Sequence, residues 1–469
     1  MKNEMNKKCE NIRPVWHYSI NKGWMNDPNG LIYYKGYYHL YFQYYPYAAT
    51  HGPMHWGHVK SKDLIHWTDV GIALYPDAMG EIYSGCMVYD KDNKSELVKN
   101  EKPLIAVFTQ HRIGGNGKTQ EVQSIAYSLD EGTSFIKYSG NPVLTDSNSD
   151  FRDPKIIYSE KTDSFVMLLA RGLEICFYES RNLRDWIYNG SYSHTKIDGE
   201  RVWECPDLIR FKKDDDKEVW ALLFSTNTQG KENDAVYYLM GSFNGHAFTP
   251  DKTNCIHKMD FGSDFYAAAT YVNQEKRNIL LAWMNNWNYA EKIPGNNFRG
   301  CLTIPRELYL KDIDSEIYIC QKTIEELENN ICESKEEYTD GKLELTSNPC
   351  IIEITGIREN MNITISNEQS EAFTINYNRN ENKVTMDRSK CHCEFAETSL
   401  NVRSTVLKNP IRNMKLLMDT TSIELFINEG EMCGTMLCFW NNPYQVLTAT
   451  DRNLQMRLLN RKGEIDEGL

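Results

Sequence analysis

Over the first two-thirds of the chain, apolar and polar residues alternate in short runs that turn residues interrupt. Residues 31–34 and 37–43 flank the dipeptide Lys35-Gly36, which is the pattern of a β-hairpin. The same alternation predicts further strands at residues 165–170, 174–178, 219–225 and 236–240. This part of the chain shows no long stretch of helical periodicity. The pattern therefore predicts an all-β fold.

A short motif recurs four times in this region. In each copy a serine is followed two positions later or nearby by Asp or Asn, and then by an aromatic residue. The copies begin at Ser61, Ser128, Ser180 and Ser242, which are 67, 52 and 62 residues apart. Four-stranded units at this interval are typical of a β-propeller, in which the serine and the Asp or Asn cap a turn. Four copies and one degenerate unit predict five blades, and four unrelated hairpins are the alternative.

The pattern changes near Lys311. Residues 323–330 predict a short capped helix or an acidic linker. Alternation resumes from about Leu343 and predicts an antiparallel β-sandwich, with strands at residues 351–354, 373–375 and 422–427. We therefore expect a five-bladed β-propeller followed by a C-terminal β-sandwich. The expected ranges are 1–311 for the propeller, 312–335 for a linker and 336–469 for the sandwich.

Length, charge and composition narrow the class of protein. A chain of 469 residues is longer than one core, which stops growing at roughly 250–300 residues, and this supports two domains. No apolar run exceeds six residues, whereas a membrane-spanning helix needs about 20. The net charge of −13 disfavours nucleic acid and anionic membranes as partners.

The cysteines and the N-terminal residues bear on the compartment. The chain has 13 scattered cysteines without a C-x-x-C pair, and its first residues show no apolar signal segment. Both features lead us to expect a cytoplasmic protein. A metal clip at Cys391-His392-Cys393 is disfavoured, because no second ligand pair has the spacing of a zinc site. No metal and no cofactor are expected.

Three carboxylates stand in unusual contexts. Asp27 lies in WMNDPNG, Asp153 in FRDP and Glu204 in WECPD. Because proline interrupts strand pairing, we expect each carboxylate at a strand end. In a propeller the strand ends that face the axis converge, so the three side chains are expected to meet. A plain turn is the alternative for each motif alone, and the three together favour a site.

These motifs resemble glycoside hydrolase family 32, which contains invertases, exo-inulinases, levanases and sucrose-6-phosphate hydrolases. The resemblance includes YSG at 83–85, DFYAA at 264–268 and the stretch from Trp283 to PREL at 305–308. It runs from about Val15 to Leu310 and continues in MDTTSIELFIN at 418–428, which is similar to the sandwich signature of the family. The family fold is a five-bladed propeller plus a β-sandwich, which agrees with the repeats.

The resemblance implies that Asp27 is the nucleophile, Glu204 the general acid/base and Asp153 the stabiliser of the transition state. A carboxylate on one face of the sugar can form a covalent ester while an acid on the other face protonates the leaving oxygen. We expect hydrogen bonds from Asn26 or nearby amides to lower the pKa of Asp27, and Arg152 to keep Asp153 ionised. Crowding by the other two carboxylates should keep a proton on Glu204. The carboxyls of Asp27 and Glu204 should lie about 5–5.5 Å apart, the spacing of retaining enzymes.

The resemblance also implies a set of residues that bind the sugar. The motif positions that it assigns to this role are Trp24, Asn26, Gln43, Trp56, Tyr83, Ser84, Arg152, Asp264, Tyr266 and Trp283. For each tryptophan, packing between blades is the alternative. The sequence departs from the family pattern at Tyr83, at Cys86 and at Thr420-Thr421, which leaves fine specificity open.

The expected activity is hydrolysis of terminal non-reducing β-D-fructofuranosides. We expect a retaining β-fructofuranosidase that converts sucrose to glucose and fructose and that also accepts short fructans. The alternatives are an exo-fructanase (inulinase or levanase) and a sucrose-6-phosphate hydrolase. A propeller that binds carbohydrate without activity is disfavoured because all three carboxylates are present, and the WMNDPNG and WECPD contexts argue against an arabinan-cleaving enzyme. The expected partner is a small saccharide, and a homodimer through the sandwich is a further expectation.

Overall fold

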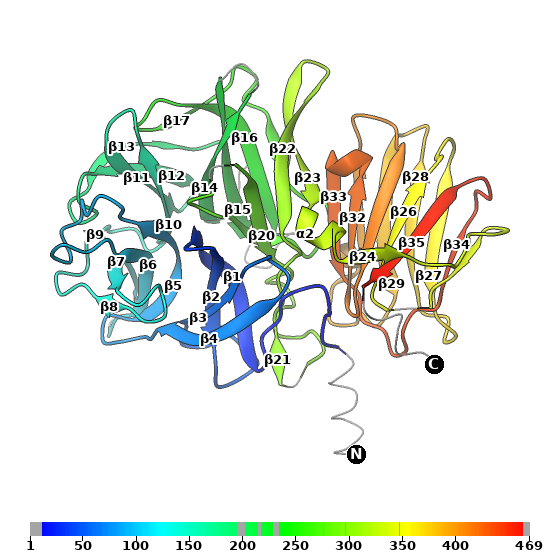
Figure 1. Cartoon of the computed structure of the whole chain (residues 1–469), viewed down its shortest axis with the longest axis horizontal. Helices are drawn as coiled ribbons and strands as arrows, with labels where there is room; N and C mark the ends of the chain where they lie inside the picture. The colour runs from blue at the N-terminus through cyan, green and yellow to red at the C-terminus, as the bar shows by residue number, and fades with distance from the viewer. Residues whose placement is uncertain are drawn as a thin grey trace. The chain divides into compact units, whose positions relative to one another are not determined.

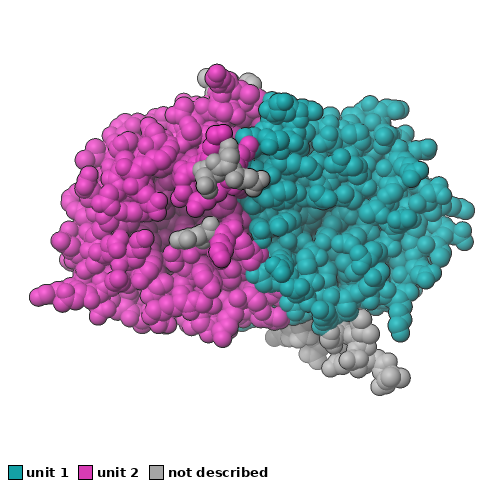
Figure 2. Space-filling model, turned by 45° about the horizontal axis from the view of Figure 1, so that its top comes forward, with its two compact units in different colours: residues 1–21, 259–265, 284–469 teal, residues 22–258, 266–283 magenta. Residues whose placement is uncertain are grey.

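The computed structural model describes residues 12–115, 117–194, 202–213, 217–227, 234–274, 276–295, 297–346 and 348–462. The chain divides into two compact units, which Figure 2 colours separately. Unit 1 contains residues 1–21, 259–265 and 284–469, and unit 2 contains residues 22–258 and 266–283. The regular structure of the described residues is almost all strand, which confirms the all-β prediction. None of their helices is long and apolar enough to cross a membrane.

Unit 2 contains antiparallel sheets whose strands follow one another in chain order. The first sheet contains β1 (Gly23–Tyr34), β2 (Tyr37–Tyr45), β3 (His55–Ser61) and β4 (Trp67–Leu74). The second contains β5 (Glu81–Tyr89), β6 (Leu104–Ile113), β7 (Thr119–Ser128) and β8 (Ile136–Lys137), with β9 (Leu144–Thr145) also paired to β7. The third contains β10 (Phe151–Ser159), β11 (Ser164–Arg171), β12 (Glu174–Ser180) and β13 (Ile187–Tyr192).

The remaining strands of unit 2 continue this order. The fourth sheet contains β14 (Val202–Lys212), β15 (Glu218–Asn227), β16 (Ala235–Phe243) and β17 (Phe248–Pro250), with β18 (Ile256–Lys258) also paired to β16. β19 (Tyr266–Thr270) and β20 (Asn278–Trp283) form a further antiparallel pair. The first strands β1, β5, β10, β14 and β19 contact one another in a closed ring. Figure 1 shows the sheets of this unit arranged around the ring of first strands. This arrangement confirms the propeller, and the number of blades stays a prediction.

The recurring serine motif marks the turn between the third and the fourth strand of each sheet. Ser61 Oγ donates a hydrogen bond of 3.0 Å to Asp63 Oδ1, which also accepts the backbone N–H groups of Ile65 and His66. The same bond joins Ser128 to Asp130 and Ser180 to Asn182. In the fourth copy Asn244 Oδ1 caps the turn by accepting two backbone N–H groups. The motif therefore repeats because each sheet needs the same capped turn.

Strand β11 shows why the inner strands are apolar along their whole length. Side chains alternate between the two faces of a strand. Val166 and Leu168 belong to one buried cluster, with Trp203 and Phe224 of the fourth sheet. Met167 and Leu169 belong to another cluster, with residues of the second sheet. Both faces of the sheet are thus covered by neighbouring sheets, and a continuous apolar run is the expected sequence pattern.

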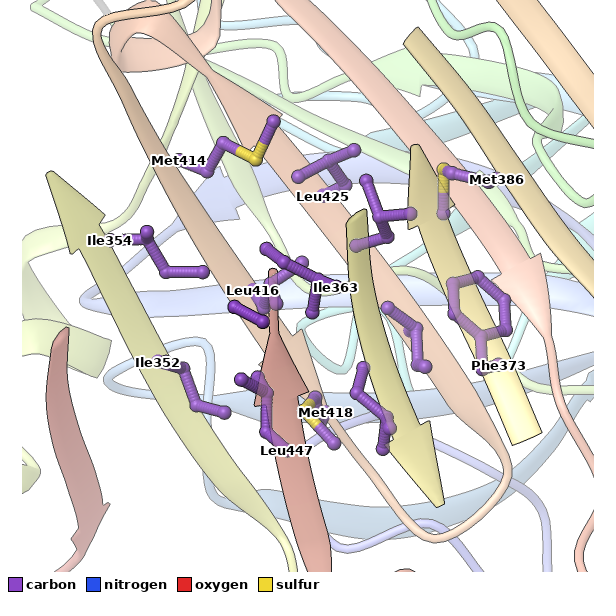
Figure 3. Close-up of a cluster of buried hydrophobic side chains, with 14 of the residues drawn as sticks. Ile352, Ile354, Ile363, Phe373, Met386, Met414, Leu416, Met418, Leu425 and Leu447 are labelled. Atoms are coloured by element: carbon purple, nitrogen blue, oxygen red, sulfur yellow. The ribbon is translucent and has the colours of Figure 1, made fainter. Parts of the chain in front are cut away.

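Unit 1 contains the β-sandwich, built from two antiparallel six-stranded sheets. One sheet contains β24 (Ile331–Glu333), β35 (Gln455–Arg461), β26 (Cys350–Thr355), β31 (Asn413–Met418), β32 (Ser422–Ile427) and β33 (Met432–Leu437). The other contains β25 (Lys342–Glu344), β34 (Val446–Ala449), β27 (Met361–Ser366), β28 (Ala372–Asn378), β29 (Lys383–Lys390) and β30 (Val402–Val406). Ile352, Ile363, Phe373, Leu416 and Leu447 point into the shared core (Figure 3).

The segment 312–335, expected as a linker, contains regular structure. The strands β22 (Arg306–Ile313) and β23 (Glu316–Thr323) pair antiparallel, and the helical turn α2 (Glu325–Glu328) and β24 follow. The expected short helix at 323–330 is thus present as α2. The other short elements of unit 1 are β21 (Phe298–Arg299), α3 (Thr398–Asn401) and the 3₁₀ turn η1 (Asn428–Gly430).

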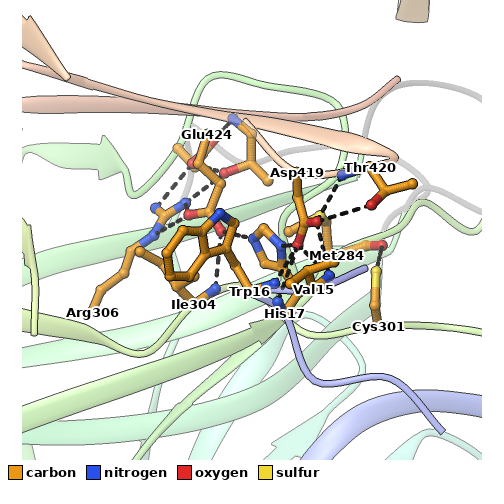
Figure 4. Close-up of polar contacts among 12 residues, drawn as sticks. Val15, Trp16, His17, Met284, Cys301, Ile304, Arg306, Asp419, Thr420 and Glu424 are labelled. Carbon is orange, nitrogen blue, oxygen red and sulfur yellow. Dashed lines mark hydrogen bonds and ion pairs between the residues drawn. The ribbon is translucent and has the colours of Figure 1, made fainter. Parts of the chain in front are cut away.

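A buried polar network inside unit 1 holds the residues that precede the propeller (Figure 4). Asp419 accepts the backbone N–H groups of Val15, Trp16 and His17. The His17 ring lies 2.7 Å from Asp419 and 2.7 Å from Glu424. Burial opposes a charge on His17, but the two carboxylates overcome this cost and raise the pKa of His17 to about 9. Asp419 and Glu424 belong to the stretch that resembles the sandwich signature, so the network gives that signature a structural role.

Candidate active site

β-Bulges shape the centre of unit 2. The register of the first strands shifts between Met25 and Pro28, between Arg152 and Lys155, and between Glu204 and Asp207. The other two first strands shift at residues 83–84 and 267–268. A bulge interrupts the ladder and re-aims a side chain. Pro154 and Pro206 lie within bulges and Pro28 directly follows one. Because β1, β10 and β14 continue through the three motifs, the expectation that each carboxylate lies at a strand end was wrong.

Three residues in these bulges adopt a left-handed backbone. Asp153 has φ of 64°, Cys205 of 50° and Ala267 of 50°. Such conformations cost energy in residues other than glycine and persist where the surrounding structure fixes them. The strain lies next to the acidic side chains, as is common at functional sites.

Asp27 is held from two sides. Ser84 Oγ donates a hydrogen bond of 2.7 Å to Asp27 Oδ2, and Asn26 Nδ2 donates one of 3.0 Å to Oδ1. Asn26 is itself held by Trp24 Nε1 at 2.8 Å. Burial raises the pKa of Asp27, and the bonds from Ser84 and Asn26 only partly oppose it. The expected hydrogen bond from Asn26 is present and acts to lower this pKa, but desolvation outweighs it.

Cys205 links Asp27 to Asp153. Its backbone N–H donates a hydrogen bond of 3.0 Å to Asp153 Oδ2. Its Sγ lies 3.5 Å from the same oxygen and 3.6 Å from Asp27 Oδ2. Burial raises the pKa of Asp153 to about 8, with Arg152 opposing the shift and the carboxylates of Glu204 and Asp27 adding to it. The expectation that Arg152 keeps Asp153 ionised is therefore wrong, because burial outweighs the guanidinium.

Glu204 is clamped by two side chains. Arg152 donates to Glu204 Oε1 from Nη2 at 2.8 Å and from Nε at 3.1 Å. The Tyr266 hydroxyl donates to the other oxygen, Oε2. Burial and the adjacent Glu204 raise the pKa of Tyr266 well above its usual value, so the hydroxyl keeps its proton. Both carboxyl oxygens of Glu204 thus have fixed donors, which set its orientation.

Glu121, which was not predicted from the sequence, forms an ion pair with Arg152. Arg152 Nη1 donates to Glu121 Oε2 at 3.1 Å and to Asp150 at 2.8 Å. Glu121 also accepts the Phe151 backbone N–H at 2.7 Å, and the His111 ring lies 3.1 Å from it. Glu121 lies in β7 and its partners Phe151 and Arg152 in β10, so only the packing of neighbouring sheets brings them together. No local motif around Glu121 could have revealed this contact.

Aromatic residues surround the carboxylates. The rings of Trp24 and Trp283 lie 6.1 Å apart, and those of Trp283 and Tyr266 lie 6.5 Å apart. Tyr83 stacks on His111 at 4.3 Å. These contacts bring the predicted sugar-binding residues of unit 2 to one place.

Gln43 in β2 and Trp56 in β3 lie opposite each other, and both side chains are buried. Trp56 packs between Tyr41 and Phe108, which matches the alternative of blade packing, while its Nε1 donates to the Tyr83 carbonyl at 3.0 Å. Trp56 therefore fixes the position of Tyr83 from within the core.

Asp264 does not belong to this cluster, so its predicted sugar-binding role is not supported. It lies in unit 1 and is fully buried. Its Oδ1 accepts the Tyr289 hydroxyl at 2.5 Å, and its Oδ2 accepts Arg388 Nη1 at 2.7 Å and the Leu437 N–H at 2.8 Å. Both oxygens are used by protein donors. The motif DFYAA thus divides between the two units, with Tyr266 at the site and Asp264 in a structural ion pair.

The cluster contains the chemical groups that an acetal cleavage needs. Three carboxyls in one buried place repel each other when ionised, so the cluster retains a proton near neutral pH. One carboxylate can attack a sugar carbon while a protonated carboxyl serves the leaving oxygen. Among the described residues, no group of three or more His, Cys, Asp or Glu is placed to hold a metal ion.

Comparisons with known proteins match both parts of the chain. The model of the glycosyl hydrolases family 32 N-terminal domain matches residues 17–322, and that of the family 32 C-terminal domain matches residues 323–463. A levanase of Bacillus subtilis (strain 168) is 34% identical over 453 residues, with 91% of this chain and 66% of the relative covered. The chain thus spans just under two-thirds of the length of that levanase.

Two further proteins illustrate the range of the likeness. An invertase of Schizosaccharomyces pombe is 38% identical over 316 residues, with 64% of this chain and 53% of the relative covered. The crystal structure of an exo-inulinase from Aspergillus awamori is similar with a TM-score of 0.85 and 27% identity, covering 96% of this chain and 98% of that one.

Proposed function

Because this chain belongs to glycoside hydrolase family 32, we propose that it is a retaining β-fructofuranosidase acting on sucrose and short fructans. The observation that carries this proposal is the meeting of three acidic motifs, distant along the chain, in one buried cluster. Cys205 touches both Asp27 and Asp153, and its neighbour Glu204 is clamped by Arg152 and Tyr266. No turn-forming role explains three buried carboxyls with fixed donors.

The proposed reaction has two steps. In the first, Asp27 attacks the anomeric carbon of the fructosyl unit, and Glu204 gives a proton to the leaving oxygen. The bond to the leaving group breaks and an ester of Asp27 forms. In the second step, Glu204 takes a proton from water, the water oxygen attacks the same carbon, and Asp27 leaves as a carboxylate. Fructose is released with its configuration retained.

The other residues of the cluster position the sugar and the acid. Arg152 and Tyr266 hold Glu204 in one orientation, so that its proton faces the leaving oxygen. Asp153, next to the nucleophile, is placed to bind sugar hydroxyls and to stabilise positive charge in the transition state. Trp24 and Trp283 are fully buried, so in this proposal they pack behind the carboxylates and fix their positions. The expected separation of about 5–5.5 Å between the carboxyls of Asp27 and Glu204 remains part of this proposal.

The substrate is tested by product analysis on four fructosides side by side. Fructose release should be measured from sucrose, sucrose 6-phosphate, inulin and levan at equal enzyme concentration. We expect fructose from sucrose and from short fructans. Release from inulin or levan alone would favour the exo-fructanase alternative, and release from sucrose 6-phosphate alone would favour the phosphosugar hydrolase. No release from any of the four would contradict the proposed activity.

Two expectations, on the oligomeric state and on the cellular compartment, remain proposals. A homodimer through the sandwich would show as twice the monomer mass in sedimentation, and a monomeric mass at micromolar concentration would contradict it. The reducing, cytoplasmic compartment is supported only by the scattered cysteine pattern of the sequence.

A further inference from the structure

An aromatic ladder of four side chains runs along the surface of the first sheet of unit 2. It consists of Tyr45, Tyr47, His55 and Tyr75. Neighbouring ring centres lie 5.6 Å apart from Tyr45 to Tyr47, 6.0 Å from Tyr47 to His55 and 5.5 Å from His55 to Tyr75. Tyr47 is 75% exposed and Tyr75 is 56% exposed, which is unusual for large aromatic side chains.

The ladder begins beside the carboxylate cluster. Tyr45 lies directly opposite Trp24 in the pairing of β1 with β2, so the two side chains share one face of the sheet. Trp24 in turn bonds Asn26, which bonds Asp27. Two side chains, those of Trp24 and Asn26, thus connect Tyr45 to the proposed nucleophile Asp27.

The far end of the ladder is connected to the bulge of β5. His55, in the middle of the ladder, precedes Trp56 and therefore points to the opposite face of β3 from Trp56, whose Nε1 donates to the Tyr83 carbonyl. At the far end, the loop of Tyr75 is anchored by Asp77, which accepts Gln110 Nε2 at 2.9 Å. Gln110 pairs with Ile82, the residue before Tyr83 and Ser84. The loop of Tyr75 is therefore connected through Asp77 and Gln110 to the strand that carries Ser84.

The rungs are suited to an uncharged ligand. The two exposed rings, Tyr47 and Tyr75, are phenols, and His55 lies between them. Burial lowers the pKa of His55, so it is neutral at neutral pH. Lys137, a cation that acts on His55, pairs with Asp77 at 2.6 Å. Exposed aromatic faces beside a saccharide site offer stacking surfaces for the C–H faces of sugar rings, and their hydroxyls can bond sugar oxygens.

We propose that the aromatic ladder binds the fructan chain beyond the scissile bond, so that substrates longer than sucrose gain contacts that sucrose lacks. This inference rests on the proposed function, because the terminal fructosyl unit must occupy the carboxylate cluster. A disaccharide extends only to the mouth of the cluster. Additional units then reach Tyr47 and Tyr75, the two most exposed rungs.

The test compares substrates of different length in matched variants. Tyr47→Ala and Tyr75→Ala should each lower kcat/KM for a fructan tetrasaccharide about three- to tenfold more than for sucrose, which is the size expected for one lost aromatic contact. Tyr47→Phe keeps the ring and should retain most of the preference for the longer substrate. Tyr188→Ala is the control, because Tyr188 is 49% exposed but lies on β13 of the third sheet.

The outcomes separate this inference from the proposed function. Equal losses on sucrose and on the tetrasaccharide, no loss on either, or the same loss in Tyr188→Ala would overturn the ladder while fructosidase activity stands. A wild-type enzyme that releases no fructose from any substrate would overturn both. Unfolding temperatures of all variants should be measured as well, and because the substituted side chains are exposed, they should stay close to the wild-type value.

Discussion

A single guanidinium organises the acidic cluster at the scale of residues. Arg152 donates to Glu204 on one side and to Glu121 and Asp150 on the other. It is thus one cation among several buried carboxylates, and its position decides how much positive charge Glu204 experiences. Glu121 is ionised at neutral pH, because His111 and Arg152 outweigh its burial and lower its pKa. Glu121 is therefore a positioning residue for the proposed acid.

Replacing Glu121 by Gln should disturb Glu204 through Arg152. The variant keeps the shape of the side chain but removes the negative charge that balances the guanidinium. The net positive charge beside the carboxyl cluster then increases, which favours loss of the proton that the cluster retains near neutral pH. We expect kcat/KM to fall about 10- to 100-fold and the alkaline limb of its pH profile to move to lower pH.

The control for this variant is Glu131→Gln. Glu131 pairs with Lys35 at 2.8 Å, but both side chains are more than half exposed. Such surface pairs contribute little, so its pH profile should follow the wild type. A Glu121→Gln enzyme with a lower rate but an unshifted profile would show that Glu121 is merely structural.

At this scale the sequence revealed the carboxylates but not all their neighbours. Asp27, Asp153 and Glu204 were predictable because each lies in a dense motif of aromatic residues and proline. Glu121 and His111 carry no such local pattern, and their contacts depend on how neighbouring sheets pack. The motif that contains Asp264 divides between the two units, because the chain passes from unit 1 to unit 2 between Phe265 and Tyr266, and its sequence does not show this division.

At the scale of elements, bulges in the first strands give the cluster its geometry. The hairpin at 31–34 and 37–43 was predictable from alternation and a glycine turn, and it is present as β1 and β2. The bulges were not predictable. An inserted residue reverses the alternation of a strand, but a strand that is buried on both faces is apolar throughout, so the reversal is not visible in its sequence. Proline was visible in the sequence, but it lies in the bulge without ending the strand.

The bulge of β5 is tested by Gly85→Ala. A methyl group at Gly85 would lie 2.1 Å from the Val107 carbonyl oxygen of the neighbouring strand, so backbone must move. The free energy of unfolding, measured with denaturant, should fall by about 1–3 kcal/mol. Ser84 in the same bulge holds Asp27, so kcat should fall as well. Gly36→Ala is a matched control for added bulk, since nothing lies within 4 Å of that position, although its positive φ adds strain of its own. Stability and kcat both equal to wild type in Gly85→Ala would contradict the role of the bulge.

At the scale of the whole molecule, contacts inside unit 1 join residues that lie far apart along the chain. The buried contact of His17 with Asp419 and Glu424 joins residues about 400 positions apart. The stretch that contains Asp419 and Glu424 was visible in the sequence, but the role of the two acids was not. They bind the N-terminal segment around His17, and a local sequence pattern cannot reveal a contact between such distant residues.

This network makes stability depend on pH in the alkaline range. The folded pKa of His17, about 9, exceeds its ordinary value of 6.5. Its stabilisation is therefore complete below about pH 6.5 and is lost as pH rises through 9. We expect Tm to fall between pH 7 and pH 10, and more steeply in the wild type than in His17→Asn, which has no charge to lose. Parallel curves for the two proteins would contradict a protonated His17.

The central claim is that Asp27 forms a covalent bond to the sugar. The most direct measurement uses Glu204→Gln with a β-fructoside whose leaving group needs no proton, so that the first step proceeds and the second is slow. After acid quench and proteolysis, mass spectrometry should find a fructosyl ester on the peptide that carries Asp27. An adduct on the Asp153 peptide, or rapid turnover of this fructoside by Asp27→Asn, would contradict the account.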